Sequence, residues 1–311
     1  MVFLIAERRW FIQSKNHMVE GPIRKPFLKW AGAKTRIAKH LRTLLPNQAK
    51  RYVEPFLGAG ALFLNTNYSS NLLADSNPDL VSVYQILKDR KEAFVATCES
   101  LFIPENNRTD RFYALREEFN DSDFSERRAV LFIYLNRHCF NGLCRYNKAG
   151  KFNTPFGRYV SPYFPRNEMR FCAEKLEAAE IRLQDFKTTF NQVHPGDVVY
   201  CDPPYIPLSA TANFTDYAMG GFSHADQQEL AKRVLEASQS GAFVMISNHN
   251  TPTSRVLYKK AAKIVTLMVS RTISCNGEKR EKAEELIAVF SQDPNWRSQQ
   301  PEIDFFMSTA A

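Results

Sequence analysis

The four residues Asp202-Pro-Pro-Tyr205 could assist the transfer of a group to an amine. They follow the segment Asp197-Val-Val-Tyr-Cys201, which has the pattern of a strand. Two prolines remove two N–H donors and leave their carbonyls free to accept hydrogen bonds. The Asp202 carboxylate and one proline carbonyl could accept both N–H groups of an exocyclic amine, while Tyr205 stacks on its ring. The nitrogen lone pair would then be localised for in-line attack on a methyl sulfonium. The alternative is a purely structural turn.

A glycine loop, Phe56-Leu-Gly58-Ala-Gly60, follows the predicted strand 51–54. Glycines let a backbone approach a ligand closely, and an acid at the end of the next strand can accept hydrogen bonds from ribose hydroxyls. Asp75, which ends the predicted strand 71–74, has that position. The pattern lacks the third glycine of dinucleotide-binding loops, which favours an adenosyl ligand without a pyrophosphate. The alternative is a tight turn with structural glycines.

These motifs require an α/β scaffold to position them. Alternating segments predict strands at 51–54, 71–74, 197–201 and 242–247 and helices at 61–64, 125–136 and after the predicted N-cap Ser223, the last ending before Gly241. The pattern predicts one doubly wound sheet, interrupted by a segment rich in Arg, Asn, Tyr and Phe. We therefore expect an N-terminal extension (1–24), a catalytic domain in two parts (25–97 and 166–292), a recognition domain between them (98–165) and a C-terminal tail (293–311).

Composition favours a polyanionic partner. The 311 residues include 41 Lys and Arg against 33 Asp and Glu, a net charge of +8. The six cysteines form no CxxC pair, and no His cluster has zinc-ligand spacing, so we expect no metal. No signal sequence and no apolar run of membrane-spanning length is present, which favours a cytoplasmic protein without membrane contact. No obligate protein partner is indicated.

Several longer segments resemble those of a known protein family. Together with Lys29-Trp-Ala-Gly-Ala-Lys34, the segments 134–137, 141–147, 152–159 and 207–214 make the chain resemble the Dam-type DNA adenine methyltransferases from about Lys25 to Phe290. The resemblance implies a Rossmann-like, S-adenosylmethionine-dependent α/β sheet with an inserted, mainly helical target-recognition domain. It also implies methyl transfer to adenine N6 in double-stranded DNA, within GATC, after the base is flipped out of the duplex.

The resemblance assigns residues by position. Catalysis falls to Asp202, Pro203, Pro204 and Tyr205, and the S-adenosylmethionine site to Trp30, Ala31, Gly32, Lys34, Phe56, Gly58, Gly60, Asp75, Asp185, Phe186 and Asp202. The implied DNA-binding residues are Lys29, Phe140, Asn141, Leu143, Arg145, Asn147, Asn153, Pro155, Arg158 and Ser209.

Within the DNA-binding set, Lys29 and Arg145 would contact guanine, and Phe140 would enter the base stack. Arg145 could instead contact a phosphate or only solvent, and Phe140 could belong to the core. Ala33 and Phe140 depart from the family pattern, in which glycine and tyrosine are common, and Ala33 could tighten the backbone around the cofactor.

Two other functions fit parts of the sequence. Pro-Pro-aromatic motifs also serve enzymes that methylate RNA or glutamine side chains, although the basic segment before Asp202 favours DNA. A DNA-binding protein that senses S-adenosylmethionine without catalysis is the second alternative. The intact motif from Asp202 to Tyr205 argues against it.

Overall fold

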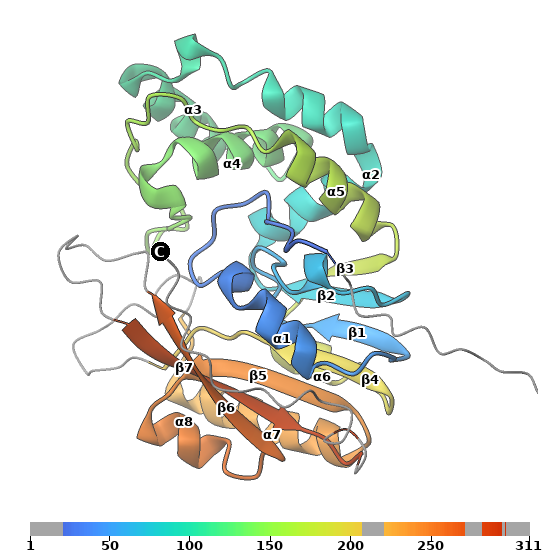
Figure 1. The fold of residues 1–311 in the computed structure, drawn as a ribbon. Helices are drawn as coiled ribbons and strands as arrows, with labels where there is room; N and C mark the ends of the chain where they lie inside the picture. The colour runs from blue at the N-terminus through green and yellow to red at the C-terminus, as the bar shows by residue number, and fades with distance from the viewer. Residues whose placement is uncertain (1–20, 207–220, 271–281, 294–295, 297–311) are drawn as a thin grey trace, which may run out of the picture.

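The computed structural model describes residues 21–206, 221–270, 282–293 and 296, so the predicted DNA-binding residue Ser209 lies outside it. Its centre is a seven-stranded sheet with the order β3-β2-β1-β4-β5-β7-β6 (Figure 1). Pairing is parallel except at β7, which runs antiparallel to both neighbours. The strands are β1 (Arg51–Glu54), β2 (Asn71–Asp75), β3 (Ala179–Leu183), β4 (Asp197–Cys201), β5 (Phe243–His249), β6 (Lys263–Ser270) and β7 (Lys282–Phe290).

Helices cover both faces of the sheet (Figure 1). The α-helices are α1 (Ala38–Leu44), α2 (Pro78–Glu99), α3 (Thr109–Asp121), α4 (Glu126–His138), α5 (Arg166–Leu176), α6 (Phe186–Phe190), α7 (His224–Gln239) and α8 (Pro252–Leu257). Short 3₁₀ turns are η1 (Lys34–Arg36), η2 (Phe63–Asn65), η3 (Pro104–Asn106) and η4 (Phe140–Gly142). The buried hydrophobic side chains form two cores. The first contains residues of α1 to α5, and the second contains residues of α6 and α7.

Alternating side chains of each central strand enter opposite cores. In β4, Val198 and Tyr200 belong to the first core, whereas Val199 and Cys201 belong to the second. This follows from the two-residue period of a strand, and burial on both faces explains why β4 is apolar from Val198 to Cys201. The doubly wound α/β sheet predicted from the sequence is therefore confirmed.

The helices between β2 and β3 share a core with the sheet. Leu73 of β2 and Phe132 of α4 belong to the same cluster of buried side chains. Helix α2 continues through the predicted domain boundary at residue 97, with one non-helical residue, Lys91, at φ 44°. These helices therefore share one hydrophobic core with the sheet.

One local prediction is wrong, and another is confirmed in detail. The helix expected at 61–64 is only the short turn η2, because side chains take carbonyls that a longer helix would use. Asn65 Nδ2 donates to the carbonyl of Ala61 at 2.8 Å, and Thr66 Oγ1 donates to that of Phe63 at 2.9 Å. By contrast, Ser223 caps α7 in a capping box with Asp226, as the sequence predicts.

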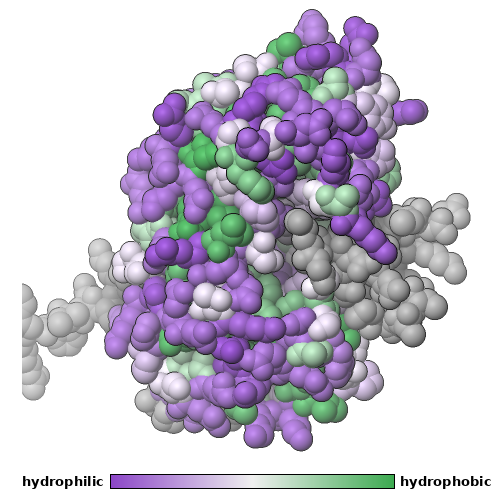
Figure 2. Space-filling model, turned by 180° about the vertical axis from the view of Figure 1, so that it is seen from behind, coloured by the Kyte–Doolittle hydropathy of each residue, from purple (hydrophilic) through white to green (hydrophobic). Residues whose placement is uncertain are grey.

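Hydrophilic side chains cover most of the face shown in Figure 2, with smaller apolar areas between them. No helix within the described ranges is long and apolar enough to cross a membrane. The same ranges contain no group of His, Cys, Asp and Glu side chains arranged to hold a metal ion.

Candidate active site

The predicted motifs meet at the carboxyl ends of three adjacent strands. Strand β1 lies between β2 and β4, and strand order reverses at the β1–β4 pair. Ligands of open α/β sheets bind outside such a reversal, because loops from the two strands diverge there. The glycine loop follows β1, Asp75 ends β2 and Asp202 follows β4. The sheet thus places three parts of one site at one edge.

Asp75 is fixed by the glycine loop and by its own turn. Its carboxylate accepts hydrogen bonds from the backbone N–H of Gly58 and of Asn77, both at 2.9 Å. Burial raises the pKa of Asp75, and these two hydrogen bonds oppose the rise. Each carboxylate oxygen has a second lone pair, so Asp75 can still accept hydrogen bonds from a ribose.

Trp30 covers the glycine loop. Gly58 has φ 47°, and a Cβ there would lie 3.0 Å from the Trp30 indole. In the turn that follows, the N–H of Ala33 donates to the carbonyl of Trp30 at 3.2 Å, and Gly32 has φ 79°. Ala33 itself has φ −52°, which any residue adopts without strain. The alanine at this position therefore imposes no backbone strain.

Lys34 brings the N-terminal motif to the Asp-Pro-Pro-Tyr motif. Its side chain is 5% exposed, and Nζ lies 3.0 Å from Oδ1 of Asp202. Nζ also lies 4.6 Å from the centroid of the Tyr205 ring, a cation–π distance. The structure therefore gives Lys34, predicted to bind cofactor, two partners in the catalytic motif.

Several charges set the ionisation of Asp202. Burial raises its pKa, the Lys34 ammonium lowers it, and the Glu285 carboxylate raises it. Oδ1 is buried and accepts no aligned hydrogen bond from the described residues, although it is within ion-pair distance of Lys34. Glu54, at the end of β1, is fully buried, and burial raises its pKa well above the usual value. Each carboxylate oxygen has two lone pairs, so Asp202, although paired with Lys34, can still accept a hydrogen bond from a ligand.

Two buried amide side chains hold the Pro-Pro-Tyr turn from behind. Gln227 Nε2 donates to the Pro204 carbonyl at 2.7 Å, and the N–H of Ile206 donates to Asn248 Oδ1 at 3.0 Å. Asn248 Nδ2 in turn donates to Gln227 Oε1 at 3.2 Å. Tyr205 is thus held at the residues on either side of it. Sequence reasoning missed both amides; the available signal was a polar Asn at the end of the apolar strand β5.

Pro203 has the carbonyl that remains available. Among the described residues no hydrogen bond reaches its oxygen, whereas that of Pro204 is occupied by Gln227. Tyr205 is oriented by a 3.2 Å hydrogen bond from its hydroxyl to Glu285 Oε2. It also makes a T-shaped contact with the His249 ring, with 4.7 Å between the ring centroids. The acceptor pair for an amine is therefore Asp202 with Pro203.

Three aromatic rings gather beside the glycine loop. Phe56 lies 5.6 Å from Phe186 and 5.7 Å from Phe222 between ring centroids, and the other two rings are 5.5 Å apart. The N–H of Gln184 donates to the Asp75 carbonyl at 3.1 Å, which brings the following Asp185 to this end of β2. The rings form an apolar wall suited to a purine. Phe222 was not predicted from the sequence.

The N-terminal Lys29 joins the predicted recognition segment. Its backbone N–H and carbonyl form hydrogen bonds with the amide side chain of Asn136, at 2.9 and 2.7 Å. A Cβ on Gly142 would lie 2.4 Å from Cβ of Lys29, so only glycine permits this approach. Lys29 Nζ lies 4.2 Å from the centroid of Tyr159, whose hydroxyl accepts a 2.9 Å hydrogen bond from the Asn141 N–H. Tyr159 is a further residue that sequence reasoning missed.

Other predicted DNA-binding residues surround this junction. Phe140 is 51% exposed, as expected for an aromatic tip rather than for a core residue. Its N–H donates to the Pro155 carbonyl at 2.8 Å. The Leu143 carbonyl accepts a 2.6 Å hydrogen bond from Thr154 Oγ1. Arg158 is exposed at φ 53°, so its backbone adopts an uncommon left-handed conformation.

Arg145 and Asn153 form a pair on the adjacent hairpin. Arg145 Nε donates to Asn153 Oδ1 at 2.8 Å, which leaves both terminal NH₂ groups for another partner. Asn147 has a different role, because its side-chain oxygen accepts the N–H groups of Ala149 and Lys151 at 3.0 Å and shapes the turn. The structure therefore brings Arg145 and Asn153 together and gives Asn147 a local structural function.

The sheet order and the site at its edge define a Rossmann-like methyltransferase that acts on an amino group. The chain belongs to the family of D12 class N6 adenine-specific DNA methyltransferases, whose pattern it matches over residues 30–273. It is an adenine-specific DNA methyltransferase.

Similar proteins match most of the chain. The chain is 50% identical to the "DNA adenine methylase" of Serratia marcescens over 267 residues, which cover 86% of this chain and 98% of that protein. It is 46% identical to a protein of the same name from Vibrio cholerae over 268 residues, 86% of this chain and 96% of the relative. The Escherichia coli (strain K12) protein of that name is 46% identical over 266 residues, 86% and 95% of the two chains.

Proposed function

We propose that this enzyme methylates adenine N6 within GATC in double-stranded DNA, with S-adenosylmethionine as methyl donor and with the target base flipped out of the helix. The observation that carries the proposal is the acceptor pair beside the ring of Tyr205: the Asp202 carboxylate and the Pro203 carbonyl, which accepts no hydrogen bond from the described residues. An exocyclic amine has two N–H groups, and this pair offers two acceptors. Asp75 at the same edge of the sheet supplies an acceptor for a ribose.

The residues would act by orienting the amine. Asp202 and Pro203 accept its two N–H groups and draw the nitrogen toward tetrahedral geometry, while Tyr205 holds the ring. When bound, S-adenosylmethionine supplies an electrophilic methyl group. The amine becomes acidic only as its new bond forms, so its proton can pass to the Asp202 carboxylate or to water without a strong base. Electrostatic positioning of this kind lowers the barrier because the acceptors are already in place.

Recognition of DNA would fall to the segment 98–165 together with Lys29. Lys29, Phe140 and the Arg145–Asn153 pair belong to connected loops, and the junction of Lys29 with Gly142 fixes their relation. An arginine can read guanine O6 and N7 with two donors, and an exposed aromatic can replace a flipped base in the stack. The net charge of +8 supports a polyanionic substrate.

The proposal predicts a substrate preference that one assay measures. Labelled methyl transfer should occur to N6 of adenine in GATC duplexes and should fall roughly 5- to 150-fold for each single base-pair change. A matched RNA duplex and a glutamine-containing peptide should remain unlabelled. Equal rates on GATC and on altered duplexes would contradict the GATC assignment. Preferred labelling of RNA or of the peptide would contradict the DNA substrate.

The charges around Asp202 predict opposite shifts in the pH profile. If the ionised carboxylate is the acceptor, the single-turnover rate should rise as pH passes upward through its pKa. Lys34 lowers that pKa and Glu285 raises it. The part of the pH profile in which the rate rises is its acidic limb. Lys34→Gln should therefore move the acidic limb to higher pH, and Glu285→Gln should move it to lower pH. Rates are measured at saturating S-adenosylmethionine and duplex. An acidic limb that does not shift in either variant, or that shifts in the same direction in both, would contradict the role of the ionised Asp202 carboxylate.

A further inference from the structure

The Arg145 and Asn153 side chains stand at the base of a short hairpin. Its strands pair through a bridge between Tyr146 and Phe152, and the N–H of Asn153 donates to the Arg145 carbonyl at 3.0 Å. Successive side chains alternate between its two faces. Arg145 is exposed, whereas Phe152 is only 1% exposed and Tyr146 packs against the core. Whatever holds Tyr146 therefore sets the position of Arg145.

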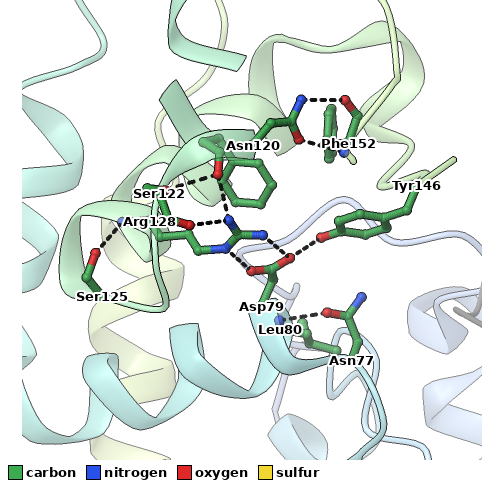
Figure 3. Close-up of polar contacts among 10 residues, drawn as sticks. Asn77, Asp79, Leu80, Asn120, Ser122, Ser125, Arg128, Tyr146 and Phe152 are labelled. Carbon is green, nitrogen blue, oxygen red and sulfur yellow. Dashed lines mark hydrogen bonds and ion pairs between the residues drawn. The ribbon is translucent and has the colours of Figure 1, made fainter. Parts of the chain in front are cut away.

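Asp79 holds Tyr146 from the sheet side of the molecule. The Tyr146 hydroxyl donates to Asp79 Oδ2 at 2.6 Å (Figure 3). Arg128 Nε of α4 donates to Oδ1 of the same carboxylate at 2.6 Å. Asp79 is 4% exposed and Arg128 is 12% exposed. A carboxylate this deeply buried needs such partners, because burying an unpaired charge is costly. One carboxylate thus joins α2, α4 and the hairpin.

A second contact with the hairpin comes from α3. Asn120 of α3 accepts the Phe152 N–H at 2.7 Å and donates to the Phe152 carbonyl at 3.2 Å (Figure 3). Asn120 fixes the hairpin to α3, whereas Asp79 fixes it to the first turn of α2. That turn begins at Pro78, three residues after Asp75, and the intervening Asn77 donates its N–H to the Asp75 carboxylate at 2.9 Å. Asp79 therefore relates the hairpin to the end of β2.

We propose that Asp79 is a positioning residue for base recognition. It acts through the Tyr146 hydroxyl to hold Arg145 where it can contact its target base. The proposal rests on the proposed function, in which Arg145 reads a guanine. With the hydroxyl bond present, the hairpin is fixed on both sides. Without it, the Asn120 side remains and the hairpin can tilt, so the geometry of a two-donor contact is relaxed. The expected consequence is a loss of sequence discrimination rather than a loss of methyl transfer.

Tyr146→Phe tests this role because it removes a single hydroxyl. The measured quantity is the ratio of kcat/KM on GATC to kcat/KM on a duplex altered at the guanine. The ratio should fall about three- to tenfold, the equivalent of one hydrogen bond. The Kd for S-adenosylmethionine should stay within about twofold of wild type, since Asp75 keeps its own contacts. Tyr134→Phe is the matched control, because Tyr134 donates a buried 2.6 Å hydrogen bond to the Asn106 carbonyl, and neither residue belongs to the hairpin.

A double-mutant cycle with Arg145→Ala separates positioning from general stability. If Tyr146 acts through Arg145, the double variant should discriminate no worse than Arg145→Ala alone. Tyr134→Phe should lower kcat/KM equally on both duplexes or leave it unchanged. An unchanged ratio in Tyr146→Phe, with a lowered ratio in Arg145→Ala, would overturn the role of Asp79 and leave the proposed function intact. If Arg145→Ala also left the ratio unchanged, the guanine contact itself would fail, and the positioning role with it.

Discussion

Replacing Asp202 with alanine is expected to lower the single-turnover rate of methyl transfer at least about a hundredfold, the usual effect of losing a preorganised electrostatic contact. The variant removes the carboxylate acceptor, whose Oδ1 lies 3.0 Å from Lys34 Nζ. Pro203 would then hold only one of the two N–H groups of the amine. DNA affinity should stay within a few fold, because the carboxylate lies at the end of β4 and not in the recognition hairpin.

Two further variants make the result interpretable. Asp202→Asn keeps a carbonyl acceptor without the charge, so its rate should lie between those of wild type and alanine, and its acidic limb should disappear. Asp197→Asn is the control, since Asp197 is a buried acid at the opposite end of β4, 2.7 Å from Arg51. Its rate should remain close to wild type in folded protein. A rate for Asp202→Ala within about tenfold of wild type would contradict the acceptor role.

Parts of the fold with a local cause could be predicted from the sequence. The strands 51–54 and 197–201 were predicted at their observed bounds, because both contain neighbouring apolar residues whose side chains enter the two cores alternately. Ser223 was identified as a cap because its hydrogen-bonding partner is three residues away. The prediction of a helix after the glycine loop is wrong because Asn65 also donates to the distant Arg24 carbonyl at 3.0 Å, a contact that no local pattern reveals.

The site residues divide in the same way into those that a local pattern marks and those that only the fold brings together. Asp202 and Asp75 were found because strand ends and glycine loops mark them in sequence. Gln227 and Asn248 were missed, since their importance comes from meeting the Pro-Pro-Tyr turn in space. Asp79 was missed for the same reason. The positions of Lys29 and Gly142 in one junction depend on packing between segments far apart in the chain, and sequence reasoning reached Lys29 only through resemblance to a family.

Arg145→Ala is expected to cost about 1–3 kcal/mol of discrimination at one base pair, because a guanidinium that donates two hydrogen bonds to guanine has no substitute in alanine. In this structure Nε is occupied by Asn153, which leaves the two terminal NH₂ groups as the donors. The ratio of kcat/KM on GATC to that on a duplex altered at the guanine should therefore fall roughly 5- to 150-fold. Rates on the altered duplex should change little.

A phosphate contact would give a different result. Lys148→Ala is the matched comparison, since Lys148 is an exposed cation on the turn of the same hairpin. If Lys148 contacts a phosphate, its loss should weaken binding evenly on all duplexes and make the slope of log Kd against log salt shallower by about one unit. Arg145→Ala should instead change the base preference with a smaller change in slope. A uniform loss for Arg145→Ala, with the slope reduced as for a phosphate contact, would make Arg145 an anchor on the DNA backbone. Lys29, held against Gly142 beside the same hairpin, would then be the next side chain to test for the guanine contact.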